Sequence, residues 1–210
     1  GHSWKAEWTV DKAPTCTKAG SKSHHCSVCG KKNDITSIPK AHKYVEKVTR
    51  TATADRAGKV TKTCSVCGNK QTVTVAKIKT VTLSKKSFIY DGTAKKPLVT
   101  VKDANGKKLV NKTDYTIKYA KGRKNIGTYK VTITFKGKYE GKKVLKFTIG
   151  LAKVKGVKAV SNSNRTVKLT YKKVEGAKKY IIYYSTAKDG TYKKLGTASK
   201  LTYTTPVLSK

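Results

Sequence analysis

The chain has 210 residues and a formal net charge of +37, from 48 Lys and Arg residues against 11 Asp and Glu residues. Only four of the basic residues are Arg, so Lys carries almost all of the positive charge. Proteins that read nucleic-acid bases rely on the bidentate Arg guanidinium, and we therefore expect no specific nucleic-acid binding. No stretch reaches the roughly 18 apolar residues of a membrane span, so the sequence predicts no transmembrane helix.

The N-terminal part of the chain contains two copies of the pentapeptide Cys-Ser-Val-Cys-Gly, at residues 26–30 and 64–68. A segment that recurs at a fixed spacing is the mark of an internal repeat. Two Cys residues separated by two others can hold one metal ion from a tight turn, and the Gly that follows eases the backbone of that turn. We call each pentapeptide a knuckle, and predict two Cys/His repeats at residues 1–39 and 40–78.

The first repeat carries a complete set of four metal ligands. Its opening His-x-aromatic segment contributes His2, and Cys16 precedes the knuckle residues Cys26 and Cys29. One imidazole and three thiolates suit a closed, tetrahedral, structural zinc site. His42, which follows the first repeat, is the alternative to His2, but that choice would leave the second repeat with two ligands, so the sequence favours His2.

The second repeat has Ala54 at the position that corresponds to Cys16. Its own candidate ligands are therefore three: His42, Cys64 and Cys67. This repeat would bind zinc with a ligand borrowed from the first repeat, such as His24 or His25, or bind it weakly with water in the open position, or bind none. The sequence leaves these alternatives open.

Disulfide bonds are the alternative use of the cysteines. In a secreted protein Cys residues pair more often than they bind metal, although five of them cannot all pair. A bound metal ion or a disulfide bond would each stabilise such a unit, because units of 38 residues are too small to bury a stable core. The neighbouring His24, His25 and Cys26 do not predict an enzyme, because a thiolate that is bound to a metal cannot attack a substrate.

Residues 79–149 show short alternating runs that are broken by Gly, Asp and Asn, a pattern typical of hairpins in a β-sandwich. In this segment Tyr129, Val131 and Ile133 share one face of a predicted half-buried strand, with Lys and Thr on the other face. Alternation of this kind does not favour a long helix. We therefore predict a β-sandwich domain here.

Two motifs in this domain carry a resemblance. The Tyr-Asp-Gly motif at 90–92 and the Asn-x-Gly-x-Tyr-x-Val motif at 125–131 resemble those of the bacterial Ig-like repeats of surface proteins from Gram-positive gut anaerobes. Modules of this kind serve as spacers, so the resemblance implies an Ig-like domain at 79–149 with a spacing role.

The C-terminal segment, residues 150–210, resembles a fibronectin type III module from similar proteins. The resemblance rests on the runs 166–171, 174–177 and 180–184, and Tyr171 stands where that family often has Trp. The family pattern continues with two more strands after the end of this chain, so the resemblance implies a truncated module. Short Cys/His repeats are also seen beside such modules.

The predicted fold is mainly β, with two metal- or disulfide-stapled repeats, an Ig-like sandwich and a fibronectin-like sandwich. We expect a non-catalytic segment of an extracellular bacterial protein, secreted or attached to the cell wall, that acts in adhesion, display or spacing. Two alternatives are a Lys-rich module that binds anionic glycans or cell-wall polymers, and an accessory region of a secreted hydrolase. The sequence does not indicate the oligomeric state.

Overall fold

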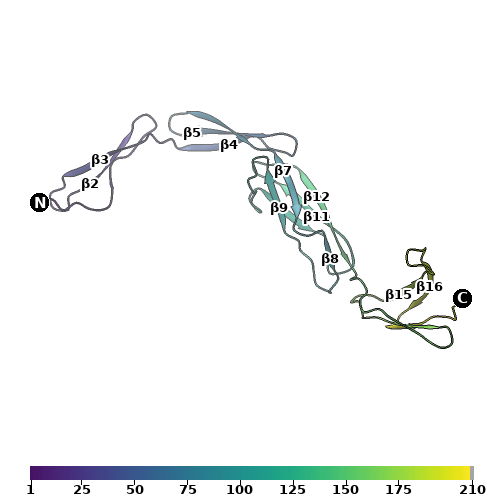
Figure 1. The fold of residues 1–210 in the computed structure, drawn as a ribbon. Coiled ribbons are helices and arrows are strands. Elements are labelled where there is room, and N and C mark those ends of the chain that lie inside the picture. Colours follow the sequence, from purple (N-terminus) through teal and green to yellow (C-terminus); the bar gives the residue numbers. More distant parts are fainter. Residues whose placement is uncertain (209–210) are drawn as a thin grey trace. The chain divides into compact units, whose positions relative to one another are not determined.

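The computed structural model describes residues 1–208, which form strands, turns and loops and no helix (Figure 1). The predicted mainly-β fold is confirmed. None of the described residues belongs to a helix that is long and apolar enough to cross a membrane. The chain divides into two compact units. The first comprises Gly1–Thr80, Val101–Thr116 and Thr134–Gly141, and the second comprises Val81–Thr100, Ile117–Ile133 and the chain from Lys142 onward.

Each Cys/His repeat is a three-stranded antiparallel sheet whose strand order follows the chain. The strands are β1 (Thr9–Lys12), β2 (Gly20–His25) and β3 (Lys32–Ile38) in the first repeat, and β4 (Tyr44–Arg50), β5 (Gly58–Cys64) and β6 (Lys70–Val75) in the second. The knuckle forms the turn between the second and third strands of each sheet. Gly30 and Gly68 close these turns at φ of 69° and 71°, in the left-handed region that Gly enters without strain.

Neither repeat contains a hydrophobic core of ordinary size. In the first repeat the buried residues are Gly20, Ser23 and Cys26; between residues 40 and 77 they are Ala52, Gly58, Val60 and Cys64. A fully buried Val or Leu side chain stabilises a fold by only about 1.5–3 kcal/mol, which is small against the cost of ordering each repeat. A cross-link would therefore add stability that the packing of each repeat does not supply.

Residues 78–150 form two further sheets. One has the order β10 (Tyr115–Tyr119), β11 (Gly127–Phe135), β12 (Lys142–Gly150) and β8 (Ser87–Ile89), and the other pairs β7 (Ile78–Leu83) with β9 (Val99–Asp103). Strand β8 is parallel to β12. In β11 every second side chain from Val131 to Phe135 is buried, which is the period of two that the sequence predicts for a half-exposed strand.

Aromatic rings build part of the core of the second unit. Phe147 is 1% exposed and lies between Phe88, in an edge-to-face arrangement, and Tyr129. Both pairs of ring centroids are 5.6 Å apart, which is within the favourable range for aromatic contacts. Tyr129, predicted to face inward, therefore contributes to this core.

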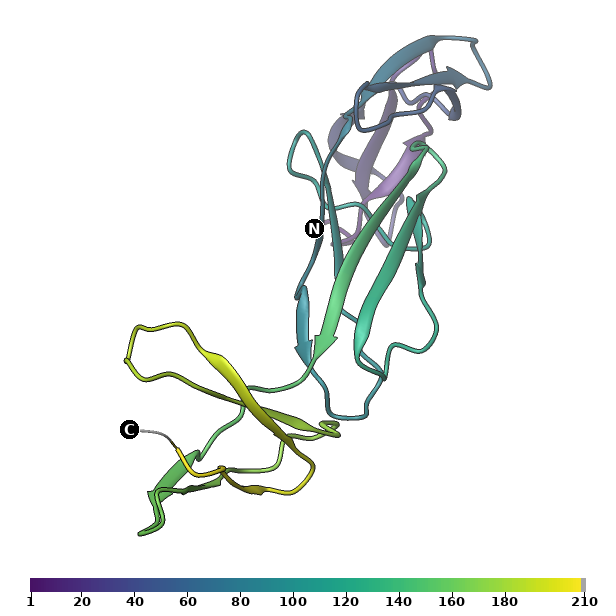
Figure 2. The ribbon, with the colours of Figure 1, turned by 90° about the vertical axis from the view of Figure 1, so that its right-hand side faces the viewer.

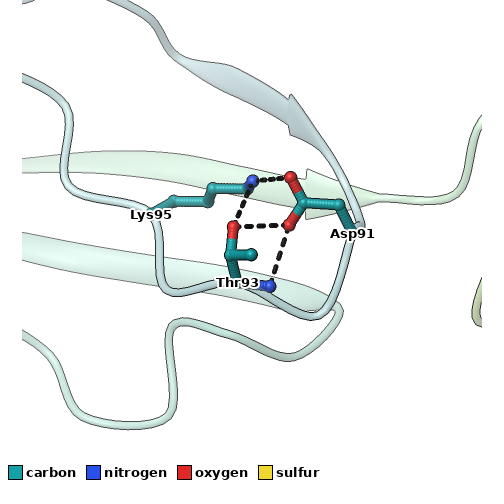
Figure 3. Close-up of polar contacts among 3 residues, drawn as sticks. All are labelled: Asp91, Thr93 and Lys95. Carbon is teal, nitrogen blue, oxygen red and sulfur yellow. Dashed lines mark hydrogen bonds and ion pairs between the residues drawn. The ribbon is translucent and has the colours of Figure 1, made fainter.

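A polar cluster closes the loop between β8 and β9 (Figure 3). The carboxylate of Asp91 accepts hydrogen bonds from the backbone N–H of Thr93 at 2.8 Å and from its hydroxyl at 2.6 Å, and Lys95 pairs with the same carboxylate. Lys95, followed by Thr93, holds the pKa of Asp91 well below its usual range. The Tyr-Asp-Gly motif thus has a structural role as a loop-closing turn.

The C-terminal segment forms two small sheets of its own (Figure 2). One contains β13 (Lys158–Ser161), β14 (Val167–Thr170) and β17 (Thr202–Thr204), and the other is the hairpin of β15 (Tyr180–Tyr184) and β16 (Lys193–Ala198). Tyr171, Val174 and Tyr180 make a small core, and a cleft of about 470 Å³ lies beside them. Tyr183 and Tyr184, by contrast, are exposed.

Candidate metal centre

The structure gathers Cys and His side chains into two groups, both in the first unit. The first group consists of His2, Cys26 and Cys29; the second consists of Cys16, His42, Cys64 and Cys67. Within each group the ligand atoms all lie within 4.8 Å of one another. Tetrahedral coordination with metal–sulfur bonds of about 2.3 Å separates the sulfur atoms by roughly 3.8 Å. Both groups therefore have the dimensions of a metal site.

The two groups are built in the same way. His2 Nδ1 lies 3.2 Å from Cys29 Sγ, and His42 Nδ1 lies 3.2 Å from Cys67 Sγ. In each case the His ring packs on the aromatic residue two positions later, with centroids 5.1 Å apart in the first repeat and 5.3 Å in the second. The His-x-aromatic opening and the knuckle thus form one unit in each repeat.

A backbone hydrogen bond holds the opening segment against the knuckle. The N–H of Ser27 donates to the carbonyl of Ser3 at 2.8 Å, and the N–H of Ser65 donates to that of Lys43 at 2.9 Å. The bond leaves the His side chain beside the second Cys of the knuckle. The equivalence of the two groups therefore extends to the backbone that positions them.

Cys16 lies in the second group, which corrects its expected place in the first. Its Sγ is 3.3 Å from Cys64 Sγ. The reason is the length of β2, which separates the Cys16 turn from the knuckle of the same repeat: six residues of extended chain span about 20 Å. The Cys16 turn instead lies next to the second repeat, where the carbonyl of Thr15 accepts a hydrogen bond from Ala41 N at 3.2 Å.

The two other His residues do not join either group. His24 Nδ1 lies 2.8 Å from the carbonyl of Lys5, and its ring packs on Trp8 with centroids 4.2 Å apart. His25 Nε2 lies 2.7 Å from the carboxylate of Asp11. His24 and His25 are the sequence-based candidates for a fourth ligand that the second repeat borrows from the first. Neither lies in the second group, and Cys16 lies there instead.

The electrostatics of the cysteines suit a bound cation. The N–H of Cys29 is the main cause that lowers the pKa of Cys26 to about 6, and the N–H of Cys67 likewise lowers that of Cys64 to about 5. The neighbouring Cys64 raises the pKa of Cys16 to about 11. A thiolate beside a thiolate is unfavourable without a positive charge, and a metal ion would supply that charge.

We expect metal binding by the second group to depend steeply on pH. Because the pKa of Cys16 lies far above 7, this thiol must lose a proton on binding, and its contribution to the affinity should rise about tenfold per pH unit between roughly pH 7 and 9. Zn²⁺ competition against a chelator at several pH values measures this slope. The Cys16→Ala variant should release one proton fewer per ion, and an unchanged slope would contradict the assignment of Cys16.

Gly20 permits the close approach of β2 to the turn that carries Cys16. A Cβ at this position would lie 2.6 Å from the backbone N of Pro14, and one at the equivalent Gly58 would lie 2.7 Å from Ala52 N. Real Cβ atoms do not approach backbone so closely, so any larger residue must displace the turn. This explains why both repeats have Gly here.

The variant Gly20→Ala should therefore weaken Zn²⁺ binding by the second group about tenfold, because it displaces a ligand without removing it. Titration of the purified chain measures this effect. Gly58→Ala is the matched control, since it makes the same clash at a turn that has no ligand. Equal losses in both variants would mean that the Cys16 turn has no special role in binding.

A second polar network lies inside the first repeat. Asp11, whose side chain is 7% exposed, accepts a hydrogen bond from the hydroxyl of Ser23 at 2.6 Å and pairs with Lys32 at 2.7 Å and with His25 at the same distance. Lys32 and then Ser23 hold the pKa of Asp11 well below its usual range. Ser23 donates to the carboxylate and not to His25, so the arrangement does not activate a nucleophile.

This network was not predicted from the sequence. Its residues lie on the three strands β1, β2 and β3, and no local motif joins them. For Cys16 the sequence offers only an indirect signal, the kind of module that follows each repeat, and not the contact itself. Cys16 belongs to the repeat that is followed by a second knuckle repeat, whereas Ala54 belongs to the repeat that is followed by the sandwich.

Comparison with known families identifies the central part of the chain. The MBG domain family matches residues 77–183, which is just over half of the 210 residues. The chain belongs to this family, whose domain is a β-rich, non-catalytic module. The match includes β7 to β14 and begins after the last Cys, so both metal groups precede it. No curated protein and no solved structure matches the chain.

Proposed function

We propose that the chain is a non-catalytic segment of a modular extracellular bacterial protein, secreted or attached to the cell wall, with a role in adhesion, display or spacing. The MBG domain at residues 77–183 carries this proposal, because it is a module type without catalytic chemistry. The cluster of Ser23, His25 and Asp11 adds support. Its Ser23 hydroxyl donates to Asp11 and not to His25, so no base is placed to activate it as a nucleophile.

Zinc is the metal that best suits the two groups. Three thiolates and one imidazole in the second group form a soft donor set, which favours zinc over magnesium or calcium. The first group has three ligands and would bind more weakly, with water or another donor in the fourth position. In this role the ion replaces the hydrophobic core that each repeat lacks.

The segment after Gly150, whose residues up to 183 lie within the MBG match, would act as a further spacer, and its own strands resemble a fibronectin type III module. Its arrangement in a three-stranded sheet and a separate hairpin supports the resemblance seen in the sequence. Tyr171 and Tyr180 lie in its small core with ring centroids 4.7 Å apart, so these two rings have a packing role.

The main alternative is a module that binds anionic glycans or cell-wall polymers. The net charge of +37 favours it, and so do the exposed Lys residues of strands such as β12, where Lys142, Lys143 and Lys146 face solvent. A dispersed coat of Lys also keeps a spacer soluble, and a designed anion site would be expected to include Arg. An accessory region of a secreted hydrolase remains compatible with the same fold.

Binding at two salt concentrations tests the proposal. The chain and a poly-lysine of matched charge are compared on a sulfated glycan and on an anionic wall polymer, at about 0.15 M and about 0.5 M salt. A spacer should lose its binding in parallel with the poly-lysine as the charges are screened. Saturable binding by the chain alone at the higher salt would contradict a spacing role and support the binding module.

A further inference from the structure

The second metal group draws its ligands from both repeats. His42, Cys64 and Cys67 come from the second repeat, and Cys16 comes from a turn of the first. We call the segment that presents Cys16, residues 15–18, the donor turn. The three ligands of the second repeat form an acceptor group. The first repeat has its own acceptor group, built to the same distances, in His2, Cys26 and Cys29.

The donor turn has a counterpart of the same geometry in the second repeat. In the first turn the N–H of Thr15 donates to the carbonyl of Lys18 at 2.9 Å, and the Thr15 hydroxyl accepts from the N–H of Lys18 at 3.0 Å. Thr53 and Arg56 make the same two hydrogen bonds, at 3.0 and 3.1 Å. Both turns thus have one shape, fixed by their first Thr.

Both turns also lie at a joint between consecutive modules. The carbonyl of Thr15 accepts a hydrogen bond from Ala41 N, at the start of the second repeat, and the carbonyl of Thr53 accepts one from Ile78 N at 2.8 Å, at the start of the sandwich. The turn is therefore one of the parts of a repeat that contact the module after it.

The residue at the second position of the turn changes with the module that follows. Cys16 precedes an acceptor group, and Ala54 precedes the sandwich, which has no Cys. At the second joint Ala52 replaces the metal contact: its N–H donates to Lys138 O at 2.9 Å, and its carbonyl accepts from Glu140 N at 3.0 Å. Pro14, the counterpart of Ala52, has no N–H for such pairing. The thiol thus occurs where an acceptor group can receive it.

The first acceptor group lacks a fourth ligand from its own repeat. His24 and His25 are bonded elsewhere, and Cys16 is 3.3 Å from Cys64 in the second group. Because the two acceptor groups match in ligands, distances and backbone, the same kind of donor should complete both. That donor is a thiolate presented by a donor turn.

We propose that His2, Cys26 and Cys29 form a docking site for the Cys-bearing donor turn of a further repeat, of the type Thr-Cys-x-Lys, so that shared metal ions join successive repeats head to tail. This inference rests on the metal-binding role of the repeats in the proposed function. Each ion then acts as the joint between two modules as well as the staple of one.

A fusion protein tests the inference directly. A second copy of residues 1–40 is placed before Gly1, which puts the added Cys as far ahead of His2 as Cys16 is ahead of His42. Competition with a chelator counts the tightly bound Zn²⁺ ions. The fusion should bind one more tight ion than the original chain, with an affinity at least about 100-fold above that of the same fusion carrying Cys16→Ala in the added copy.

Ala54→Cys in the original chain is the second test. It places a thiol in the same turn, ahead of a module without an acceptor group, and should add no tight ion. Two results would overturn the inference even if the second group still binds its ion. One is a gain of one ion by this variant, and the other is equal Zn²⁺ binding by the fusion and its Cys16→Ala form. Failure of the original chain to bind any Zn²⁺ would overturn the proposed staple as well.

Discussion

The variant Cys16→Ala is expected to bind Zn²⁺ at the second group at least about 100-fold more weakly than the original chain. Loss of a residue that only supports a metal ligand already costs about 10–100-fold, and Cys16 is placed as a ligand itself, 3.3 Å from Cys64 Sγ. The remaining three ligands would leave the ion open to water. Chelator competition with the purified variant measures the change.

The matched control for this variant is Cys29→Ala, which removes one thiol from the first group and should leave the tight site intact. The two variants lose the same number of Cys residues, so any general effect of cysteine removal is common to both. An undiminished tight site in Cys16→Ala, or a larger loss in Cys29→Ala, would mean that Cys16 is not a ligand of the second group.

Removal of the metal should unfold the two repeats and leave the MBG domain folded. In the first repeat only Gly20, Ser23 and Cys26 are buried, so the stability of its sheet depends on the ion. Structural zinc sites in small domains contribute about 10–16 kcal/mol of apparent binding free energy, which is also folding free energy. The sandwich has its own core, for example around Phe147, and contains no Cys.

Amide hydrogen exchange before and after chelation measures this effect by segment. Protection in β1 to β6 should be lost, and the strands β7 to β12 should stay protected except at residues that bond to the second repeat, such as Ile78. A simultaneous loss of protection in the sandwich would show that the modules unfold as one. Protection of β2 and β5 that survives full removal of the metal would contradict the role of the ion as a staple.

Local patterns were sufficient to predict the strands and the knuckles. The alternation around Val131 and Ile133 determines which face of β11 is buried, because the side-chain period of a strand is two. The position of Gly30 after its Cys pair likewise indicated a tight turn, and the structure has this Gly at positive φ. These features depend on neighbours in the sequence, so the sequence alone could reveal them.

The position of Cys16 depends on geometry that adjacency in the sequence does not convey. Cys16 and Cys26 are ten residues apart, but the strand between them carries the two turns to opposite ends of the sheet. The Asp11 network also depends on strand pairing, since Ser23 pairs with Thr9 across a sheet whose register shifts between Val10 and Lys12. Neither contact can be predicted without knowing how the strands pair.

Protection of Cys16 from alkylation in the Zn²⁺-loaded chain tests the central claim, the shared second group, most directly. Mass spectrometry reads the modification of each Cys in the original chain and in the variants Cys64→Ala and Cys26→Ala. If Cys16 and Cys64 bind one ion, Cys16 becomes reactive in Cys64→Ala and stays protected in Cys26→Ala. The opposite pattern, with Cys16 exposed only when Cys26 is removed, would contradict the shared group and return Cys16 to the first.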